Sequence, residues 1–305
     1  MIQSGLSNEA AAHTAFDQVM GAAMSMTRDV ELAAAVVAHV RGPAAGGVHA
    51  SVADRLRSLA SAALPGLDDL DEGQRQTVAG VLTSIFRQAA DLLEHPEREP
   101  GWTFLDPVVL QATGKASMSV AGVLAQIAPR LAGLSERLEA GGAFCDVGTG
   151  TGWLAIAAAR SWPSASITGI DIFEPALRLA ASNLADVGLT NRVTLRQCDV
   201  CDLADDEFDF VWLPGPFLAE DIVSRALSAS HRSLRSGGWV AFGIYGGPPD
   251  PLAGSLAELR TIRSGGHPWT AAAATERLAD AQFADVAEID RTWSAPVRLV
   301  VGRRR

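Results

Sequence analysis

From residue 141 onward, short apolar runs alternate with stretches whose apolar positions recur every three or four residues. A short apolar run is typical of a buried strand, and the three-four spacing is typical of a helix. The predicted strands are 143–147, 166–171, 193–198, 208–213, 239–244, 283–290 and 297–301. The predicted helices are 153–160, 175–187, 221–234 and 270–281. The alternation predicts a parallel sheet with right-handed crossovers, and the short link between the last two strands predicts an antiparallel hairpin.

Upstream of residue 141 the pattern is helical throughout. It predicts helices over 8–26, 51–64, 71–94 and 117–139, and a further helix that begins after an N-cap at Thr27. Pro129 is expected to kink or divide the helix over 117–139. The helix over 71–94 carries a long apolar face that must be buried against a neighbour or a partner chain. We therefore expect two domains, a helical one over residues 1–115 and an α/β one over residues 116–305.

Composition and charge narrow the classes of protein. Hydrophobic residues make up 48% of the 305 residues and charged residues 20%, which is typical of a folded soluble chain. The 35 acidic residues outnumber the 25 basic ones and give a net charge of −10, which argues against a nucleic-acid partner. No apolar run is long enough to span a membrane, and the first residues lack the pattern of a signal peptide. We expect a cytoplasmic protein with no membrane partner.

The cysteines offer little chemistry. Three cysteines are present, and Cys198 and Cys201 form an isolated C-x-x-C pair. One such pair cannot complete a four-ligand zinc site, and no cluster of His, Asp or Glu has the spacing of a metal site. A redox role for the pair is the alternative, and we expect no bound metal.

The most informative stretch follows the first predicted strand. Gly148, Gly150 and Gly152 form a G-x-G-x-G turn that opens a helix, and Asp146 precedes the first glycine by two residues. Glycines at such a turn let a ligand approach the backbone, and a helix N-terminus favours anionic groups. A dinucleotide-binding turn has a different glycine spacing, G-x-G-x-x-G. An acid at position 146 suits the ammonium group of a methionine moiety better than a pyrophosphate.

This segment resembles motif I of the class I S-adenosylmethionine-dependent methyltransferases. Further family motifs follow in order along the chain. They are Gly169-Ile170-Asp171-Ile172, Gln197-Cys198-Asp199-Val200, Phe208-Asp209-Phe210-Val211-Trp212-Leu213 and Leu234-Arg235-Ser236-Gly237-Gly238-Trp239. The resemblance covers about residues 141–302. It implies a doubly wound α/β fold with a seven-stranded, mostly parallel sheet of order 3-2-1-4-5-7-6, in which strand 7 is antiparallel.

The resemblance also implies a set of residues that bind S-adenosylmethionine and its product S-adenosylhomocysteine. Asp171 takes the place of the family's acid that binds both ribose hydroxyls, Ile172 lies against the adenine, and Asp199 lies near the adenine amino group. The nearby Asp202, Asp205 and Asp206 compete with Asp199 for this role. The full predicted set is Asp146, Gly148, Thr149, Gly150, Gly152, Asp171, Ile172, Asp199, Val200 and Leu213.

The methyl acceptor is harder to predict. Two family signatures, a His-Asp dipeptide after strand four and an Asn-Pro-Pro-Tyr type motif, are absent. We expect the acceptor site beyond the carboxyl ends of strands four and five. His267 and Tyr245 are the candidates for a general base. The candidate substrate-binding residues are Trp102, Lys115, Trp212, Phe217 and Trp269.

The sequence thus predicts a methyltransferase that acts on a small molecule, with the acceptor atom (O, N or C) undetermined. Two alternatives are a fold member that catalyses a non-methylating reaction, such as a cyclisation, and a non-catalytic module that binds S-adenosylmethionine. The helical region 1–115 is expected to cover the acceptor site and to mediate a homodimer. A monomer that buries its own apolar faces is the alternative.

Overall fold

The computed structural model describes residues 3–42, 49–247 and 250–305. The chain forms two compact units, Met1–Ala90 and Asp91–Arg305. The predicted domain boundary between residues 115 and 116 falls inside a continuous helix, Pro107–Ile127, so the division between units lies earlier in the chain than we predicted. The covering and dimerisation roles of the helical region stay predictions.

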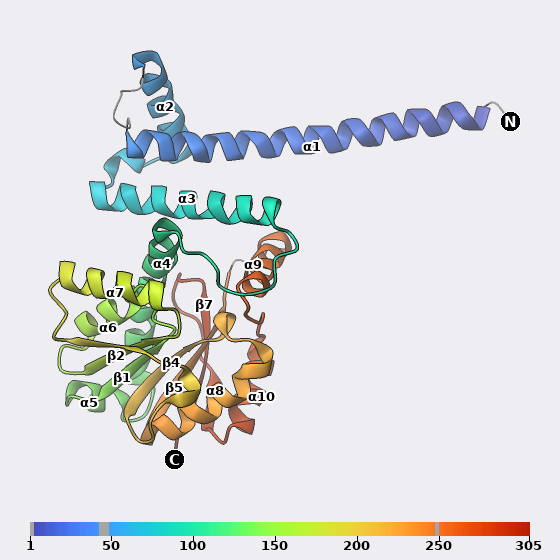
Figure 1. Ribbon diagram of the computed structural model, residues 1–305. Coiled ribbons are helices and arrows are strands. Elements are labelled where there is room, and N and C mark those ends of the chain that lie inside the picture. Colours follow the sequence, from blue (N-terminus) through green and yellow to red (C-terminus); the bar gives the residue numbers. More distant parts are fainter. Residues whose placement is uncertain (1–2, 43–48, 248–249) are drawn as a thin grey trace. The chain divides into compact units, whose positions relative to one another are not determined.

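The second unit is built on one seven-stranded sheet of order β3-β2-β1-β4-β5-β7-β6 (Figure 1). β7 is antiparallel to both of its neighbours, and the strands from β3 to β5 in this order pair in parallel. The predicted fold class and strand order are confirmed. The strands are β1 Ala143–Val147, β2 Ser166–Asp171, β3 Val193–Gln197, β4 Phe208–Pro214, β5 Leu234–Tyr245, β6 Ala284–Glu288 and β7 Val297–Arg303.

Helices cover both faces of this sheet. One core joins Phe144 and Phe210 of the sheet to Leu124 and Leu154 of the helices α4 and α6, and a second core on the other face includes Phe242. The helices of this unit are α4 Pro107–Ile127, α5 Leu134–Glu139, α6 Trp153–Ser161, α7 Glu174–Asp186, α8 Glu220–Ser233, α9 Pro251–Arg263 and α10 Ala271–Asp280. Short 3₁₀ turns lie at η2 Ala128–Arg130, η3 Val200–Asp202 and η4 Gly215–Phe217.

Two helices of this unit begin at an Asp-Pro pair. The backbone N–H of Val108 donates to Asp106 Oδ1 (2.8 Å), and α4 therefore starts ten residues before the predicted start at 117. The helix ends at Ile127, and Pro129 lies in η2, so the predicted 117–139 helix is divided into α4, η2 and α5. α9, which we did not predict, starts in the same way, with Asp250 as its N-cap. Asp as N-cap followed by Pro at N1 is a strong start signal for a helix.

α4 and η2 together form an apolar segment, Pro107–Arg130, that could cross a membrane by length and composition, with a mean hydropathy of 1.3 over its best window. Its side chains Leu124 and Ile127 are fully buried in the core beside the sheet. The place of α4 in the core therefore accounts for part of its apolar composition, since 33% of that window is buried.

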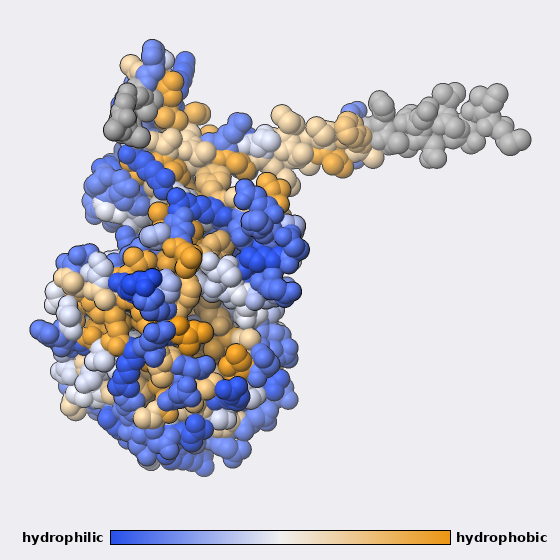
Figure 2. All heavy atoms as spheres, in the orientation of Figure 1, coloured by the Kyte–Doolittle hydropathy of each residue, from blue (hydrophilic) through white to orange (hydrophobic). Residues whose placement is uncertain are grey.

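The first unit consists of α1 Gln3–Arg41, α2 Ala50–Ala63, η1 Leu67–Asp69 and α3 Glu72–Glu94, the last of which continues into the second unit. Val36, Ala60 and Leu67 form its small core. The predicted helix break at Thr27 is wrong, because Thr27 Oγ1 donates to the Met24 carbonyl (2.7 Å) inside one continuous helix. Large apolar side chains are exposed along α1 (Figure 2). They are Phe16, Val19, Met20, Met24, Met26 and Val30.

Candidate functional site

The glycine loop, residues 148–152, connects the carboxyl end of β1 to α6. Gly148, Gly150 and Gly152 have φ of 66°, 55° and 80°, in the left-handed region that residues with a Cβ rarely adopt. The loop is fixed to the sheet because the Thr149 N–H donates to the Ile170 carbonyl of β2 (2.9 Å). The alternating glycines are therefore required by the backbone path, as their spacing predicts.

Asp146, at the end of β1, lies beneath this loop. Thr149 Oγ1 donates to Asp146 Oδ2 (2.7 Å), and the side chain is fully buried. Burial raises the pKa of the Asp146 carboxyl to about 7; the hydrogen bond from Thr149 opposes this rise and the nearby Asp171 charge adds to it. Asp146 therefore organises the loop from below, and its predicted contact with an ammonium group stays a prediction.

Asp171 and Ile172 lie at the carboxyl end of β2, next to the glycine loop. The Gly150 N–H donates to Asp171 Oδ2 and the Phe173 N–H to Asp171 Oδ1, both at 2.8 Å. Burial raises the pKa of the Asp171 carboxyl despite these backbone hydrogen bonds. Ile172 is 68% exposed, so an apolar surface lies directly beside a half-buried carboxylate. The structure thus brings the predicted ribose and adenine residues together with the loop.

The remaining predicted cofactor residues follow β3 and β4. Asp199 lies at the start of η3, where its Oδ1 accepts from the Cys201 N–H (2.8 Å), and the adjacent Val200 is buried. Leu213 of β4 is fully buried in the core on the α8 and α10 side of the sheet. Its side chain packs in this core, and its cofactor-binding role stays a prediction.

Behind the glycine loop, a polar network that we did not predict connects α4, α6 and α7. Trp153 Nε1 donates to Gln111 Oε1 (2.7 Å), Gln111 Nε2 donates to Asn183 Oδ1 (2.9 Å), and Asn183 Nδ2 donates to the Thr151 carbonyl (2.8 Å). Gly114 of α4 approaches so closely that a Cβ there would lie 1.9 Å from Thr151 Oγ1. That hydroxyl is buried without a hydrogen-bond partner. The network therefore connects the loop backbone at Thr151 to α4 and α7.

Three of the predicted substrate-binding residues pack against other side chains of the protein. Lys115 lies on α4 with its Nζ over the Trp153 ring (5.4 Å from the centroid). Trp212 is 5% exposed in the core on the α4 and α6 side, and its ring lies over Gly243. Trp269 is 7% exposed and packs against Phe242 (5.9 Å between ring centroids). Both tryptophan side chains belong to the cores beside the sheet, and their substrate-binding roles stay predictions.

The other candidates meet around η4. The Trp102 ring lies 6.2 Å from the Phe217 ring and 5.6 Å from the Phe104 ring, with edge-to-face geometry in both pairs. His267 packs against Trp269, and its Nδ1 lies 3.6 Å from Glu220 Oε2 at the start of α8. Sequence analysis did not find Glu220, because the two residues are far apart in the chain and no local pattern connects them.

Close contacts place the end of β4 beside the glycine loop and the segment before His267 against η4. A Cβ on Gly148 would lie 3.4 Å from the Pro214 side chain, and a Cβ on Gly266 would lie 1.8 Å from the Pro216 carbonyl oxygen. The segment that carries His267 therefore packs on the turn that follows β4, and β4 ends against the glycine loop. The structure thus brings His267, Phe217 and the loop to one edge of the sheet.

Tyr245 is the last residue of β5 and is 40% exposed. It pairs with Val297 of β7, and a Cβ on Gly247 would lie 2.0 Å from its hydroxyl oxygen. Its ring therefore lies over the chain that follows β5. Among the residues that the structure describes, no group of three or more His, Cys, Asp or Glu side chains could hold a metal ion.

Comparisons with known proteins fit this geometry. Residues 144–238 match a family described as "Methyltransferase domain". A U6 snRNA (guanine-N(2))-methyltransferase, THUMPD2 of Bos taurus, is 30% identical over 181 residues, which cover 57% of this chain and 36% of that protein. The chain therefore spans about a third of the length of this curated relative.

Two solved structures are similar in fold. The mitomycin 7-O-methyltransferase MmcR has a TM-score of 0.67 at 16% identity, and the match covers 97% of this chain and 99% of that one. PigF, solved with SAH, has a TM-score of 0.64 at 19% identity over 94% and 99% of the chains. At these identities the likeness concerns the fold, and it includes the helical N-terminal region. The chain therefore shares the fold of these methyltransferases, helical N-terminal region included, and residues 144–238 match a methyltransferase domain family.

Proposed function

We propose that the protein is an S-adenosylmethionine-dependent methyltransferase that methylates a hydroxyl group of a planar aromatic small molecule. The observation that carries this proposal is that the segment with His267, which pairs with Glu220, packs on η4, whose Phe217 contacts Trp102, at the same sheet edge as the glycine loop. A histidine with a carboxylate partner can accept a proton from a hydroxyl, and aromatic rings bind a planar acceptor.

The residues present fit the cofactor. The three glycines leave the loop backbone open to a ligand, and little surrounds Gly150, since a Cβ there would meet only the Gly148 carbonyl at 3.9 Å. Asp171 keeps acceptor capacity for ribose hydroxyls, because a carboxylate offers about four lone-pair sites and two are used by backbone N–H groups. The exposed Ile172 offers an apolar surface for a base.

The reaction requires alignment and the removal of one proton. S-adenosylmethionine supplies a methyl group that is already activated for in-line displacement. Trp102 and Phe217 orient the acceptor ring and exclude water, which favours the attacking geometry. His267 Nδ1 faces Glu220, which leaves Nε2 to accept the hydroxyl proton. Glu220 is a positioning residue that orients the imidazole.

Three other functions remain to be compared. An RNA acceptor is favoured by the similarity to THUMPD2 but opposed by the net charge of −10. A non-methylating reaction and a non-catalytic binding module are the other two. Formation of S-adenosylhomocysteine in step with a methylated product excludes both of these.

The test is turnover on a small panel of acceptors. We expect methylation of 2-naphthol or 8-hydroxyquinoline, and none of cyclohexanol, of a glutamine peptide or of a guanine-containing RNA oligonucleotide. Mass spectrometry of the products identifies the methylated atom. Methylation of the RNA, or of the peptide, and not of the phenols contradicts the proposal.

His267→Gln tests the proton transfer. We expect kcat/KM for 2-naphthol to fall about 10²–10⁴-fold, the usual contribution of a general base, with unchanged affinity for S-adenosylhomocysteine. The loss should be much smaller for 4-nitrophenol, which is more acidic and needs little help to ionise. His49→Gln, in the first unit, is the matched control. Equal losses on both phenols mean that His267 is not the base.

A further inference from the structure

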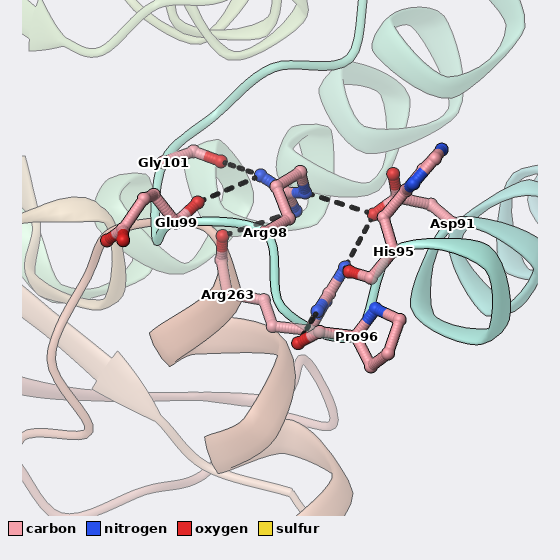
Figure 3. A network of polar contacts seen from close by, with 7 residues as sticks. All are labelled: Asp91, His95, Pro96, Arg98, Glu99, Gly101 and Arg263. Carbon is pink, nitrogen blue, oxygen red and sulfur yellow. Dashed lines mark hydrogen bonds and ion pairs between the residues drawn. The ribbon is translucent and has the colours of Figure 1, made fainter.

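Between α3 and α4, residues 95–104 form a connection without helix or strand. A cluster of three charged side chains, Asp91, Arg98 and Arg263, fixes this segment to the end of α9 (Figure 3). We call these three residues the Asp91 cluster. The glycine loop and the His267–Glu220 pair use none of them.

Both arginines of the cluster bind the same carboxylate. Arg263 Nη2 donates to Asp91 Oδ2 at 2.7 Å, and Arg98 Nε donates to the same oxygen at 3.2 Å. The exposed fractions of the three side chains are 19% for Asp91, 15% for Arg98 and 14% for Arg263. Burial opposes ionisation of Asp91, but the hydrogen bond from Arg263 and the two cationic charges outweigh it and lower the pKa of the carboxyl. The cluster is therefore charged at neutral pH.

The same arginines bind the backbone of the segment. Arg263 donates to the carbonyls of His95 (3.2 Å) and Pro96 (3.5 Å), and Arg98 donates to the Gly101 carbonyl (2.8 Å). The Gly101 N–H in turn donates to the Arg263 carbonyl (3.0 Å). The segment is thus bound to the last residue of α9 at both of its ends.

Through Arg98, the cluster contacts the aromatic residues that we assign to the acceptor site. The Arg98 guanidinium carbon lies 5.7 Å from the centroid of Phe104, whose ring contacts Trp102, and Trp102 contacts Phe217. A guanidinium at this distance attracts an aromatic face and limits its rotation. Arg98 therefore connects the Asp91 carboxylate to the rings that we assign to acceptor binding.

We propose that Arg263 and Arg98 are positioning residues that determine acceptor affinity, because the Asp91 cluster fixes the 95–104 segment, in which Phe104 packs on Trp102 and Trp102 packs on Phe217. This inference rests on the proposed function for the role of the rings. It goes beyond that function in assigning acceptor affinity to a charged cluster that touches neither acceptor nor cofactor.

The first experiment needs no acceptor. Hydrogen exchange of Arg263→Met should be about tenfold or more faster over residues 95–104, including the Gly101 amide, and unchanged in the strands of the sheet. Arg260→Met, an exposed arginine on the same helix, is the matched control and should leave exchange over 95–104 unchanged. Exchange that is unchanged over 95–104, or faster everywhere, overturns the proposal.

The second experiment separates positioning from general damage. In the presence of S-adenosylhomocysteine, Arg263→Met and Asp91→Asn should each weaken 2-naphthol binding about tenfold, as expected for the loss of one ordered aromatic contact. Affinity for S-adenosylhomocysteine itself should stay within about twofold, since the cluster lies away from the glycine loop. Arg263→Lys should recover part of the 2-naphthol affinity. Its ammonium group can still donate to Asp91 or to a backbone carbonyl of the segment, although it replaces two guanidinium nitrogens by one.

The two proposals fail in different ways. If the wild type neither binds nor methylates any phenol of the panel, the proposed function is wrong, and the assignment of acceptor affinity to the cluster fails with it. If the wild type binds 2-naphthol and Arg263→Met binds it equally well, the positioning role is wrong and the proposed function stands. Equal losses of 2-naphthol and S-adenosylhomocysteine affinity also contradict the positioning role.

Discussion

At the scale of single residues, the buried Asp146 carboxyl has a consequence for stability. Its pKa is raised to about 7 from an ordinary value of 3.8, so the folded state holds a proton that the unfolded state has lost between these two values. The stability that this group contributes is therefore complete below about pH 4 and is lost as the pH rises through about 7. Above pH 7 the folded chain carries a charge that is buried and poorly solvated.

We expect Asp146→Asn to remove this pH dependence. A difference of about three between the folded and unfolded pKa corresponds to roughly 4 kcal/mol. The free energy of unfolding of wild type minus that of Asp146→Asn should fall by about this amount between pH 4 and pH 8. Urea denaturation at both pH values measures it. A constant difference between the two proteins would mean that Asp146 titrates normally.

Gly114 and Thr151 test the packing behind the glycine loop. A Cβ at Gly114 would overlap Thr151 Oγ1, so Gly114→Ala should displace the loop, destabilise the fold by about 1–3 kcal/mol and weaken S-adenosylhomocysteine binding. Thr151→Ala removes the overlapping hydroxyl, which has no partner, and should restore much of both losses in the double variant.

Gly122→Ala is the control on the same helix. Nothing lies within 4 Å of a Cβ at this position, so the change should stabilise α4 by about 0.5–1 kcal/mol. Calorimetry measures the S-adenosylhomocysteine affinity of all four variants, and urea denaturation measures their free energy of unfolding. Additive effects of Gly114→Ala and Thr151→Ala would show that the two residues do not meet.

At this scale, the sequence predicts those site residues that lie close to one another along the chain. The glycine spacing and Asp171 are recognisable because they follow strand ends within a short stretch of chain. The burial of Leu213 and Trp212 is not local information, because strand residues alternate between faces and both faces of β4 are covered. Asn183 and Glu220 were missed because their roles depend on helices that meet only in the folded chain.

At the scale of elements, two Thr residues that precede helical patterns behave differently. Thr270, the first residue of the predicted helix 270–281, accepts from the Ala273 N–H (3.1 Å) as N-cap of α10, whereas Thr27, predicted as an N-cap, lies inside α1. Both have the same sequence signature, a hydroxyl ahead of a helical pattern. At Thr27 the preceding residues are helical as well, and the helix continues through. The Asp-Pro pairs at the starts of α4 and α9 are the stronger start signal.

Substitution of the two threonines distinguishes a cap from an internal residue. Thr270→Ala should cost about 1 kcal/mol, because the Ala273 N–H loses its acceptor. Thr27→Ala should be neutral or stabilising by about half of that, since alanine favours a helix interior. Urea denaturation compares the two variants with the wild type. A loss at Thr27 as large as that at Thr270 would argue for a helix break at residue 27.

At the scale of the whole molecule, the sheet order was predictable and the division of the chain was not. The order follows from the family's motifs, whereas the boundary after residue 90 depends on where contacts are dense. Within the first unit, α1 exposes Phe16, Met20 and Met24, which follow one another at four-residue spacing. An apolar row of this kind on a helix is typical of a surface that a partner covers.

We expect that partner to be a second copy of the chain. Light scattering should then give about twice the 31.9 kDa of one chain. Replacement of Phe16, Met20 and Met24 by glutamine should give a monomer, and the same change at Arg28, Asp29 and Glu31 of α1 is the control. A mass of one chain for the wild type excludes the dimer.

The antiparallel direction of β7 decides where the end of the chain leaves the molecule. Its last residue, Arg303, pairs with Trp239 near the start of β5, and the next residue exchanges two backbone hydrogen bonds with Gly237 and Gly238. The glycine loop and η4 lie at the opposite edge of the sheet. Anything attached after Arg305, whether further chain, an affinity tag or a tether to a solid support, therefore leaves from the edge away from the candidate site. Immobilisation through this end should leave the candidate site accessible from solution.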